Sequence, residues 1–389
     1  MQLWKYHNPV RLSVGPGVFE QIPLAIAGRT YALVTYPEPV FTDLGRRLAA
    51  ATGSQKLVIT DFHPNPTLDD LRACNAMLAL RPDVELIVAL GGGSAIDVAK
   101  ALAVGRGSQA RLLAALHGNA SSDDATISAL KLIAVPTTSG TGSDVTCWAT
   151  LWDQENSRKL SLDRPDLFPE ASFIDPELTV DLPWSITLSS GLDALSHALE
   201  SLWNHHATPL SRHLAVLGAQ TIIRTLPRLR QQPEEIALRT DLSLAALYAG
   251  LAFSTTRTAL AHSLSYPITL RFGISHGIAC SFTLPAVMQA ALGSDPRCDD
   301  ALRQIFGDLA SAPRLLARFL ADLGVSTDPA AYGVEGDIWQ ELIGEALAGP
   351  RGRNFIASDR PEHVAQVLSR ARLAQHDIEG DRSQMTGGR

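Results

Sequence analysis

Strands and helices alternate along the first part of the chain, and this alternation constrains the fold more than any other feature. Apolar runs at residues 30–35, 56–60 and 85–90 predict buried strands, and helical periodicity at residues 41–51 and 68–79 falls between them. Strands that are joined through helices pair in parallel. The pattern therefore predicts an α/β layer built on a parallel, Rossmann-like sheet.

A glycine turn follows the third of these strands directly. The stretch Gly91-Gly92-Gly93-Ser94 opens a predicted helix that reaches about residue 103. Glycines let a backbone approach a phosphate closely, and the free amides and dipole at a helix start attract the anion. The turn predicts phosphate binding, with a purely structural tight turn as the alternative.

A second loop of small residues follows a predicted strand at residues 130–135. Residues 136–143, Pro-Thr-Thr-Ser-Gly-Thr-Gly-Ser, carry five hydroxyls and two glycines. Such groups suit the phosphates or ribose of a nucleotide, whereas the alternative is a solvated hairpin loop. Two such turns after strands of one sheet favour a dinucleotide site.

The character of the chain changes after Pro183. Apolar periodicity near 3.6 dominates from there on, and no strand signal is convincing. We therefore expect an α/β dinucleotide-binding domain over residues 1–182 and an all-helical domain over residues 183–377. The polar, glycine-containing residues 378–389 predict a disordered tail.

A set of metal-ligand residue types stands in the helical half. Asp193 and His197 lie four residues apart in an apolar stretch that predicts a helix from near Gly191, so both side chains point the same way. His262 and His276 stand in apolar segments downstream. One carboxylate and three imidazoles suit Fe, Zn or Ni, and such a set leaves a position open for substrate. The alternative is a helix cap or a buried polar pair.

Composition excludes several classes of function. The formal net charge of −7 and the lack of a Lys/Arg-rich run argue against nucleic-acid binding. The start of the chain lacks a signal peptide, and the longest uncharged apolar run, residues 277–293, is too short to span a membrane. The chain has four cysteines, Cys74, Cys147, Cys280 and Cys298. They lie far apart and form no C-x-x-C pair, which argues against a disulfide framework and against a thiolate zinc site. We expect a cytoplasmic protein that acts on a small molecule.

Together these motifs resemble the iron-dependent, or group III, alcohol dehydrogenase family. The resemblance implies a Rossmann-like and a helical domain with the site in the cleft, NAD or NADP as cofactor, and a homodimer or larger assembly. It implies Fe2+ at Asp193, His197, His262 and His276, a set that also accepts Zn2+ or Ni2+. The dinucleotide contacts that it implies are Asn65, Gly91, Gly92, Gly93, Ser94, Asp97, Thr137, Thr138, Ser143 and Lys159.

Two positions depart from the family pattern. Many members carry an aspartate that accepts the adenosine ribose hydroxyls where this chain has Tyr36, and its absence leaves NADP open beside NAD. Many carry a proton-relaying histidine where this chain has Tyr266. A phenol donates a hydrogen bond but is a weak acid. We therefore expect Tyr266, beside His262, to organise a water that delivers the proton, with a core aromatic as the alternative.

Two short stretches, residues 199–204 and 259–269, look similar to the branch that reduces phosphonoacetaldehyde to 2-hydroxyethylphosphonate. Arg257 and Arg271 flank His262 and are candidates to hold a phosphonate, unless they are solvated surface residues. The expected reaction is hydride transfer between nicotinamide and a small aldehyde or alcohol. The alternatives are a generic short-chain alcohol dehydrogenase, a dehydroquinate synthase-like lyase, a metal-free maleylacetate reductase and a non-catalytic nucleotide-binding module.

Overall fold

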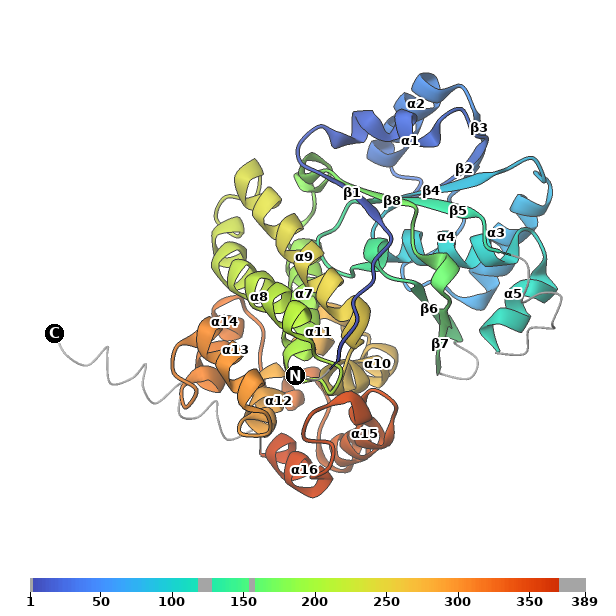
Figure 1. Ribbon diagram of the computed structural model, residues 1–389. Coiled ribbons are helices and arrows are strands. Elements are labelled where there is room, and N and C mark those ends of the chain that lie inside the picture. Colours follow the sequence, from blue (N-terminus) through green and yellow to red (C-terminus); the bar gives the residue numbers. More distant parts are fainter. Residues whose placement is uncertain (1–2, 118–127, 154–157, 371–389) are drawn as a thin grey trace. The chain divides into compact units, whose positions relative to one another are not determined.

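The computed structural model describes residues 3–117, 128–153 and 158–370, and the chain forms two compact units (Figure 1). The sheet unit comprises His7–Leu182 with Glu234–Leu244. The helical unit comprises the segment up to Tyr6, Pro183–Pro233 and the chain from Ala245 onward. The expected division into residues 1–182 and 183–377 stays a prediction; by contacts, the residues up to Tyr6 belong to the helical unit and Glu234–Leu244 to the sheet unit. The tail expected at residues 378–389 lies outside the described residues.

The sheet unit is built on six parallel strands in the order β1-β8-β5-β4-β2-β3. Their bounds are β1 Arg11–Val14, β2 Tyr31–Val34, β3 Gln55–Ile59, β4 Leu86–Gly91, β5 Lys131–Pro136 and β8 Ala171–Ile174. An antiparallel hairpin, β6 Trp148–Asp153 with β7 Arg158–Asp163, forms a second sheet. The parallel α/β fold is confirmed, but neither β8 nor the hairpin was among the predicted strands.

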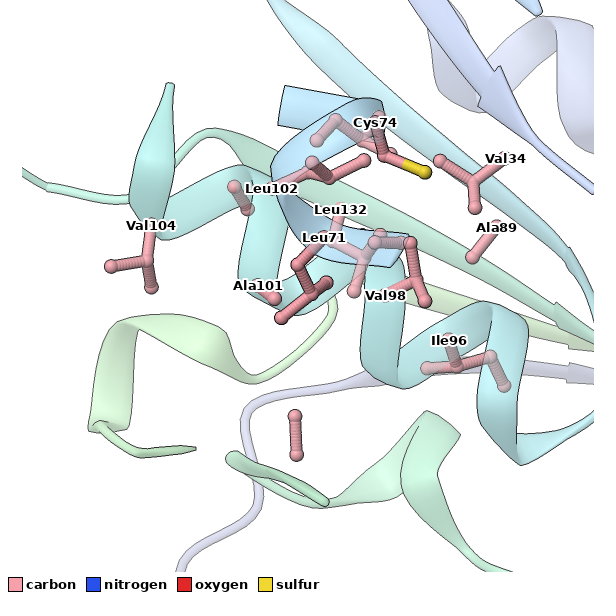
Figure 2. Packing of buried hydrophobic residues seen from close by; sticks show 14 of the residues in the cluster. Val34, Leu71, Cys74, Ala89, Ile96, Val98, Ala101, Leu102, Val104 and Leu132 are labelled. Atoms are coloured by element: carbon pink, nitrogen blue, oxygen red, sulfur yellow. The ribbon is translucent and has the colours of Figure 1, made fainter. Parts of the chain in front are cut away.

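Helices cover both faces of this sheet (Figure 1). Two buried clusters lie on its two faces, one with η1 (Val18–Gln21), α1 (Ile22–Ile26) and α2 (Pro39–Thr52), the other with α3 (Leu68–Ala79), α4 (Gly93–Gly105) and α5 (Gln109–Leu116). Figure 2 shows the second cluster, where Leu71 of α3 and Leu102 of α4 lie close to Leu132 of β5. Burial on both faces explains why these strands are continuously apolar. Short 3-10 turns are η2 Ser143–Val145, η3 Pro165–Leu167 and η4 Pro176–Thr179.

The helical unit contains no named strand among the described residues from Pro183 onward. Its helices are α7 Trp184–Leu202, α8 Pro209–Leu229, the later part of α9 Ile236–Thr256, α10 Leu260–Phe272, α11 His276–Ser281, α12 Leu284–Ala291, α13 Pro296–Phe306, α14 Ala312–Asp322, α15 Gly336–Ala348 and α16 Pro361–Ser369, with 3-10 turns η5 Pro329–Tyr332 and η6 Gly352–Asn354. Helix α7 begins at Trp184, so the expectation of a start near Gly191 was wrong. Gly191 instead lets α7 pack closely on α8, because a Cβ there would lie 2.8 Å from Leu226 Cδ2.

Helix α9 is long and apolar enough to cross a membrane by length and composition alone. Most of that stretch is buried inside the protein, as in the core helix of a soluble fold. A single such helix is weak evidence for a membrane span.

Candidate functional site

Helix α7 presents three ionisable side chains on one face. Asp193, His197 and Glu200 stand at positions i, i+4 and i+7, and all three are buried. Burying a charge is costly unless it is paired. The residues that approach this face of α7 therefore decide what the site can do.

Glu200 binds the start of α10. Its Oε1 accepts hydrogen bonds from the backbone N–H groups of Ala261 at 2.6 Å and His262 at 3.3 Å, and its Oε2 accepts one from Ala259 N at 2.9 Å. These amides have no partner within the helix, so the carboxylate completes the helix terminus. Oε2 also lies 2.6 Å from His262 Nδ1. Because a carboxylate only accepts, Nδ1 carries a proton and His262 directs Nε2 toward α7.

Three imidazoles converge on one carboxylate oxygen. Asp193 Oδ1 lies 3.4 Å from His262 Nε2, 3.7 Å from His197 Nε2 and 3.9 Å from His276 Nε2. Across the described part of the chain, neither Asp193 Oδ1 nor His262 Nε2 has a hydrogen-bond partner, although both are buried. Buried polar atoms without a partner call for an ion or a water molecule beside them. The four predicted ligands are therefore brought together around atoms that suit a cation.

The electrostatics favour a positive charge at this point. Burial acts to raise the pKa of Asp193, but His197, His262 and His276 outweigh it and hold that pKa well below its ordinary value. Burial acts to lower the pKa of His262, but Cys280, Glu200 and Asp193 raise it well above its ordinary value. Both shifts stabilise a cation beside Asp193, which is what a divalent ion would supply.

A glycine explains how α11 reaches the cluster. A Cβ at Gly277 would overlap the backbone carbonyl oxygen of Ser189, so α11 approaches α7 about one turn before Asp193. His276 is the first residue of α11 and its side chain is 28% exposed, whereas those of Asp193 and His262 are almost fully buried. The cluster is therefore open to solvent on the side of His276.

The sequence prediction missed two residues of this cluster. Cys280 Sγ lies 3.6 Å from His276 Nε2, and the ligand atoms of Asp193, His262, His276 and Cys280 all lie within 4.8 Å of one another. Glu200 is the other. Helical spacing was the signal that could have found them, since Cys280 follows His276 by four residues and Glu200 follows Asp193 by seven.

Tyr266 and an unexpected arginine lie next to the cluster. The ring of Tyr266 stacks on that of His276 at a centroid distance of 5.6 Å and an angle of 13°. The guanidinium of Arg351 stands over the Tyr266 ring, 4.9 Å from its centroid, and Arg351 Nε donates to Thr258 Oγ1 at 3.1 Å. Arg351 was missed because it lies far along the chain from His262, in a loop without periodic pattern.

The two arginines selected from the sequence are placed differently. Arg271 faces Glu341 at 3.5 Å and Glu345 at 4.0 Å on an exposed surface. Arg257 is exposed and has a positive φ of 64°. Arg271 is therefore a surface ion-pair residue, whereas the guanidinium of Arg351 lies over the Tyr266 ring beside the cluster.

The glycine turn joins β4 to α4 in the sheet unit. Gly92 is the N-cap residue of α4. No side chain caps this helix, so the backbone N–H groups of its first turn can bind an anion. A Cβ at Gly93 would lie 2.5 Å from Thr141 Cγ2, and one at Gly91 would lie 2.9 Å from Tyr36 Cε2. The turn thus packs directly against the small-residue loop and Tyr36, whose pKa burial raises to about 12.

Other predicted dinucleotide residues gather around the same turn. The backbone N–H of Asn65, which has a φ of 59°, donates to Ser94 Oγ at 3.2 Å. Thr137 N donates to Gly91 O at 3.1 Å, and Thr138 lies against Gly92. Lys159 lies on the hairpin, opposite Trp152. Burial raises the pKa of Asp97, and the positive charge of Lys159 acts to lower it.

Asp97 and Ser143 belong to a network around Lys100. Lys100 Nζ donates to Ser143 O at 2.6 Å, Trp148 O at 2.7 Å and Thr146 O at 2.9 Å. Asp97 accepts from Ser143 Oγ at 2.6 Å. Burial lowers the pKa of Lys100 from 10.5 to about 8, against the opposing effect of Asp97. These side chains fasten the small-residue loop to α4.

Comparison with known proteins identifies the family. The model of iron-containing alcohol dehydrogenases matches residues 9–176, and that of the C-terminal part of the Fe-containing alcohol dehydrogenase family matches residues 187–372. The chain belongs to the iron-containing alcohol dehydrogenase family. The family resemblance predicted from the motifs is confirmed, and the chain is an oxidoreductase of the alcohol dehydrogenase and aldehyde reductase type.

Members of this family with known activities are similar over most of the chain. Phosphonoacetaldehyde reductase of Streptomyces viridochromogenes is 32% identical over 390 residues, covering 95% of this chain and 91% of the relative. Long-chain-alcohol dehydrogenase 1 of Geobacillus thermodenitrificans is 32% identical over 310 residues, covering 76% of each. The structure of sulfoacetaldehyde reductase from Bifidobacterium kashiwanohense in complex with NAD+ has a TM-score of 0.86 and 29% identity, covering 95% of this chain and 98% of that one.

Proposed function

We propose that this chain reduces a short aldehyde that carries a phosphonate or sulfonate group, such as phosphonoacetaldehyde, with a reduced nicotinamide dinucleotide. Hydride passes to the carbonyl carbon and a proton to the carbonyl oxygen, giving the alcohol and the oxidised dinucleotide in a reversible reaction. The observation that supports this most is the pair of buried atoms, Asp193 Oδ1 and His262 Nε2, which lie 3.4 Å apart.

The donor set of the cluster fits a divalent metal ion. Asp193, His197, His262 and His276 would hold Fe2+, and Zn2+ or Ni2+ suit the same ligands. When bound, such an ion acts as a Lewis acid that polarises the substrate carbonyl. Glu200 keeps His262 in the tautomer that such a site needs, as carboxylates do beside metal-binding histidines.

Side chains around the cluster would orient the substrate and its proton. Tyr266, stacked on His276, is placed to hold a water that delivers the proton to the carbonyl oxygen, with His262 beside it. Arg351 is the cation that would bind the phosphonate or sulfonate, because a guanidinium holds two oxygens of such a group at once. Both relatives named after acidic aldehydes fit this assignment.

We further infer that the sheet unit binds the dinucleotide and the helical unit the metal. The amides at the start of α4 would bind the pyrophosphate. Asn65, Ser94, Thr137 and Thr138 would contact the rest of the dinucleotide, and Lys159 the nicotinamide ribose. NAD is the proposed cofactor, in keeping with the sulfoacetaldehyde reductase complex, and Tyr36 leaves room for NADP.

The reaction is tested by following the absorbance of the reduced nicotinamide. We expect oxidation of NADH with phosphonoacetaldehyde in protein reconstituted with Fe2+, Zn2+ or Ni2+, and loss of at least a hundredfold in kcat/KM for Asp193→Ala. No turnover with any aldehyde, ion or nicotinamide would leave a nucleotide-binding module as the better description.

The substrate class is tested separately with arginine variants. Arg351→Met should raise KM for phosphonoacetaldehyde and sulfoacetaldehyde about 10- to 100-fold, the loss of one charge-assisted bidentate contact. It should leave turnover of propanal unchanged, and Arg271→Met is the matched control on the helical unit. Equal losses for charged and neutral aldehydes would contradict the assignment and favour a generic short-chain alcohol dehydrogenase.

We also propose that the protein acts in the cytoplasm as a homodimer or larger assembly. Its four cysteines are free and buried, which fits a reducing compartment. Light scattering coupled to size-exclusion chromatography measures the assembly, and a monomer at micromolar concentration would contradict this part of the proposal.

A further inference from the structure

Cys280 lies where a ligand of the metal centre would lie. It stands on α11 one turn after His276, is fully buried, and its Sγ lies 3.6 Å from His276 Nε2 and 3.9 Å from His276 Nδ1. In the described part of the chain, its sulfur forms a compact group with the ligand atoms of Asp193, His262 and His276, all within 4.8 Å of one another.

The spacing of these atoms suits coordination of one ion. Bonds of about 2.0–2.2 Å to nitrogen or oxygen and about 2.3 Å to sulfur place neighbouring donors about 3.0–3.6 Å apart on an ion that binds five of them, the four expected ligands and Cys280. The structure has 3.4 Å between Asp193 and His262, 3.6 Å between Cys280 and His276, and 3.9 Å between Asp193 and His276. Since all ligand atoms of the group lie within 4.8 Å of one another, shifts of up to about 1 Å would bring them to bonding distance of one ion.

A buried cysteine is more often a small apolar filler, which needs no partner. That interpretation leaves the surroundings of Cys280 unexplained. Asp193 Oδ1 and His262 Nε2 are buried polar atoms without a hydrogen-bond partner among the described residues, and both belong to the same group of ligand atoms as the sulfur. A cation bound by the Cys280 sulfur, Asp193 Oδ1 and His262 Nε2 would give each of these buried atoms a partner.

We infer that Cys280 coordinates the metal ion through its sulfur, an inference that rests on the proposed metal centre. Sulfur binds as the thiolate, and its proton passes to solvent as the bond forms. A soft sulfur donor favours Zn2+ and Co2+ over Fe2+ relative to a set of nitrogen and oxygen donors alone. Cys280 thus shifts the metal preference of this chain toward Zn2+ and Co2+ within a family named for iron.

Cobalt substitution of the full-length protein tests the sulfur bond directly. We expect the near-ultraviolet charge-transfer absorption of a thiolate–cobalt bond in the wild type and in Cys298→Ser, whose cysteine is equally buried in α13. Cys280→Ser should still bind cobalt but lack this absorption. If Cys280→Ser does not fold, Cys280→Ala replaces it as the variant without a sulfur ligand. The wild-type spectrum alone already tests whether a thiolate–cobalt bond forms.

Competition between Zn2+ and Fe2+ under anaerobic conditions gives a second readout that does not depend on activity. The affinity for Zn2+ divided by the affinity for Fe2+ should fall at least tenfold in Cys280→Ser and stay unchanged in Cys298→Ser. Cobalt binding without the thiolate absorption in the wild type, or an unchanged ratio in Cys280→Ser, overturns the role of Cys280 alone. A wild-type protein that binds none of these ions overturns the metal centre as well.

Discussion

Replacing Glu200 by glutamine tests whether a residue that contacts no substrate controls the metal centre. The substitution keeps the size of the side chain and removes its charge. Each oxygen of Glu200 accepts two N–H groups: Oε1 those of Ala261 and His262, and Oε2 those of Ala259 and the His262 ring. Whichever way the amide turns, its NH2 group faces two donors and neither bond can form.

The expected magnitude follows from these bonds. Two lost hydrogen bonds to a charged acceptor cost about 1.5–3 kcal/mol each, so the free energy of unfolding of the metal-free protein should fall by about 3 kcal/mol or more. With either orientation of the amide, the acceptor that fixes the tautomer of the His262 ring is lost or becomes a neutral amide oxygen, and such a change weakens metal binding about 10- to 100-fold. That factor corresponds to about 1.4–2.7 kcal/mol of binding free energy.

Metal affinity is measured by competition with a chelator of known affinity, and stability by denaturant unfolding of the metal-free protein. Glu341→Gln is the matched control, because this carboxylate pairs with Arg271 on an exposed surface and should change either quantity by less than about 0.5 kcal/mol. A metal affinity of Glu200→Gln within twofold of the wild type would refute the reasoning, whatever happens to stability.

Three further predictions concern separate parts of the chain. Gly277→Ala should destabilise the protein by about 1–3 kcal/mol and weaken metal binding, because its Cβ overlaps the Ser189 carbonyl, whereas Gly344→Ala in α15, with open space around it, should be neutral or slightly stabilising in the same unfolding assay. Lys100 has a folded-state pKa of about 8, below its unfolded value of 10.5, so the unfolded state binds more protons between these values. Wild-type stability measured relative to Lys100→Met should therefore rise from pH 8 to 10.5 by about 3 kcal/mol, and a flat difference contradicts the burial argument. Tyr266→Phe keeps the ring that stacks on His276 and should lower kcat about 10- to 100-fold with little change in metal content, while an unchanged kcat would remove the phenol from proton delivery.

The parallel sheet and most of its helices were predictable because buried strands and amphipathic helices leave periodic patterns. Strand β8 was not, since Ala171–Ile174 has four residues and lies close to prolines at both ends. The hairpin β6–β7 was missed because three of the six residues of β7 are charged and prolines follow it, so the stretch shows no clear strand pattern. Helix α7 begins earlier than expected because Ser189, Ser190 and Gly191, which are typical residues of a helix start, lie inside the helix, where Gly191 allows close packing.

The four expected ligands were recognisable by residue type, but their partners were not. Glu200 shares a face with Asp193, yet only the fold reveals that it binds the start of α10 and the His262 ring. Arg351 becomes relevant only because the fold places its guanidinium over the ring of Tyr266. Contacts between distant segments are set by packing, and local patterns in the sequence do not record them.

The charges around the metal centre explain why an acidic substrate would need an arginine. Asp193 and Glu200 together carry two negative charges, which a divalent ion balances, and a thiolate at Cys280 would add a third. The centre itself therefore offers a phosphonate or sulfonate no net attraction, and Arg351 supplies the missing positive charge beside Tyr266. If this balance holds, KM for the acidic aldehydes rises with ionic strength, because salt screens a half-exposed guanidinium, while KM for propanal does not. In Arg351→Met the salt dependence disappears, and its persistence there would assign the recognition of the acid group to another cation.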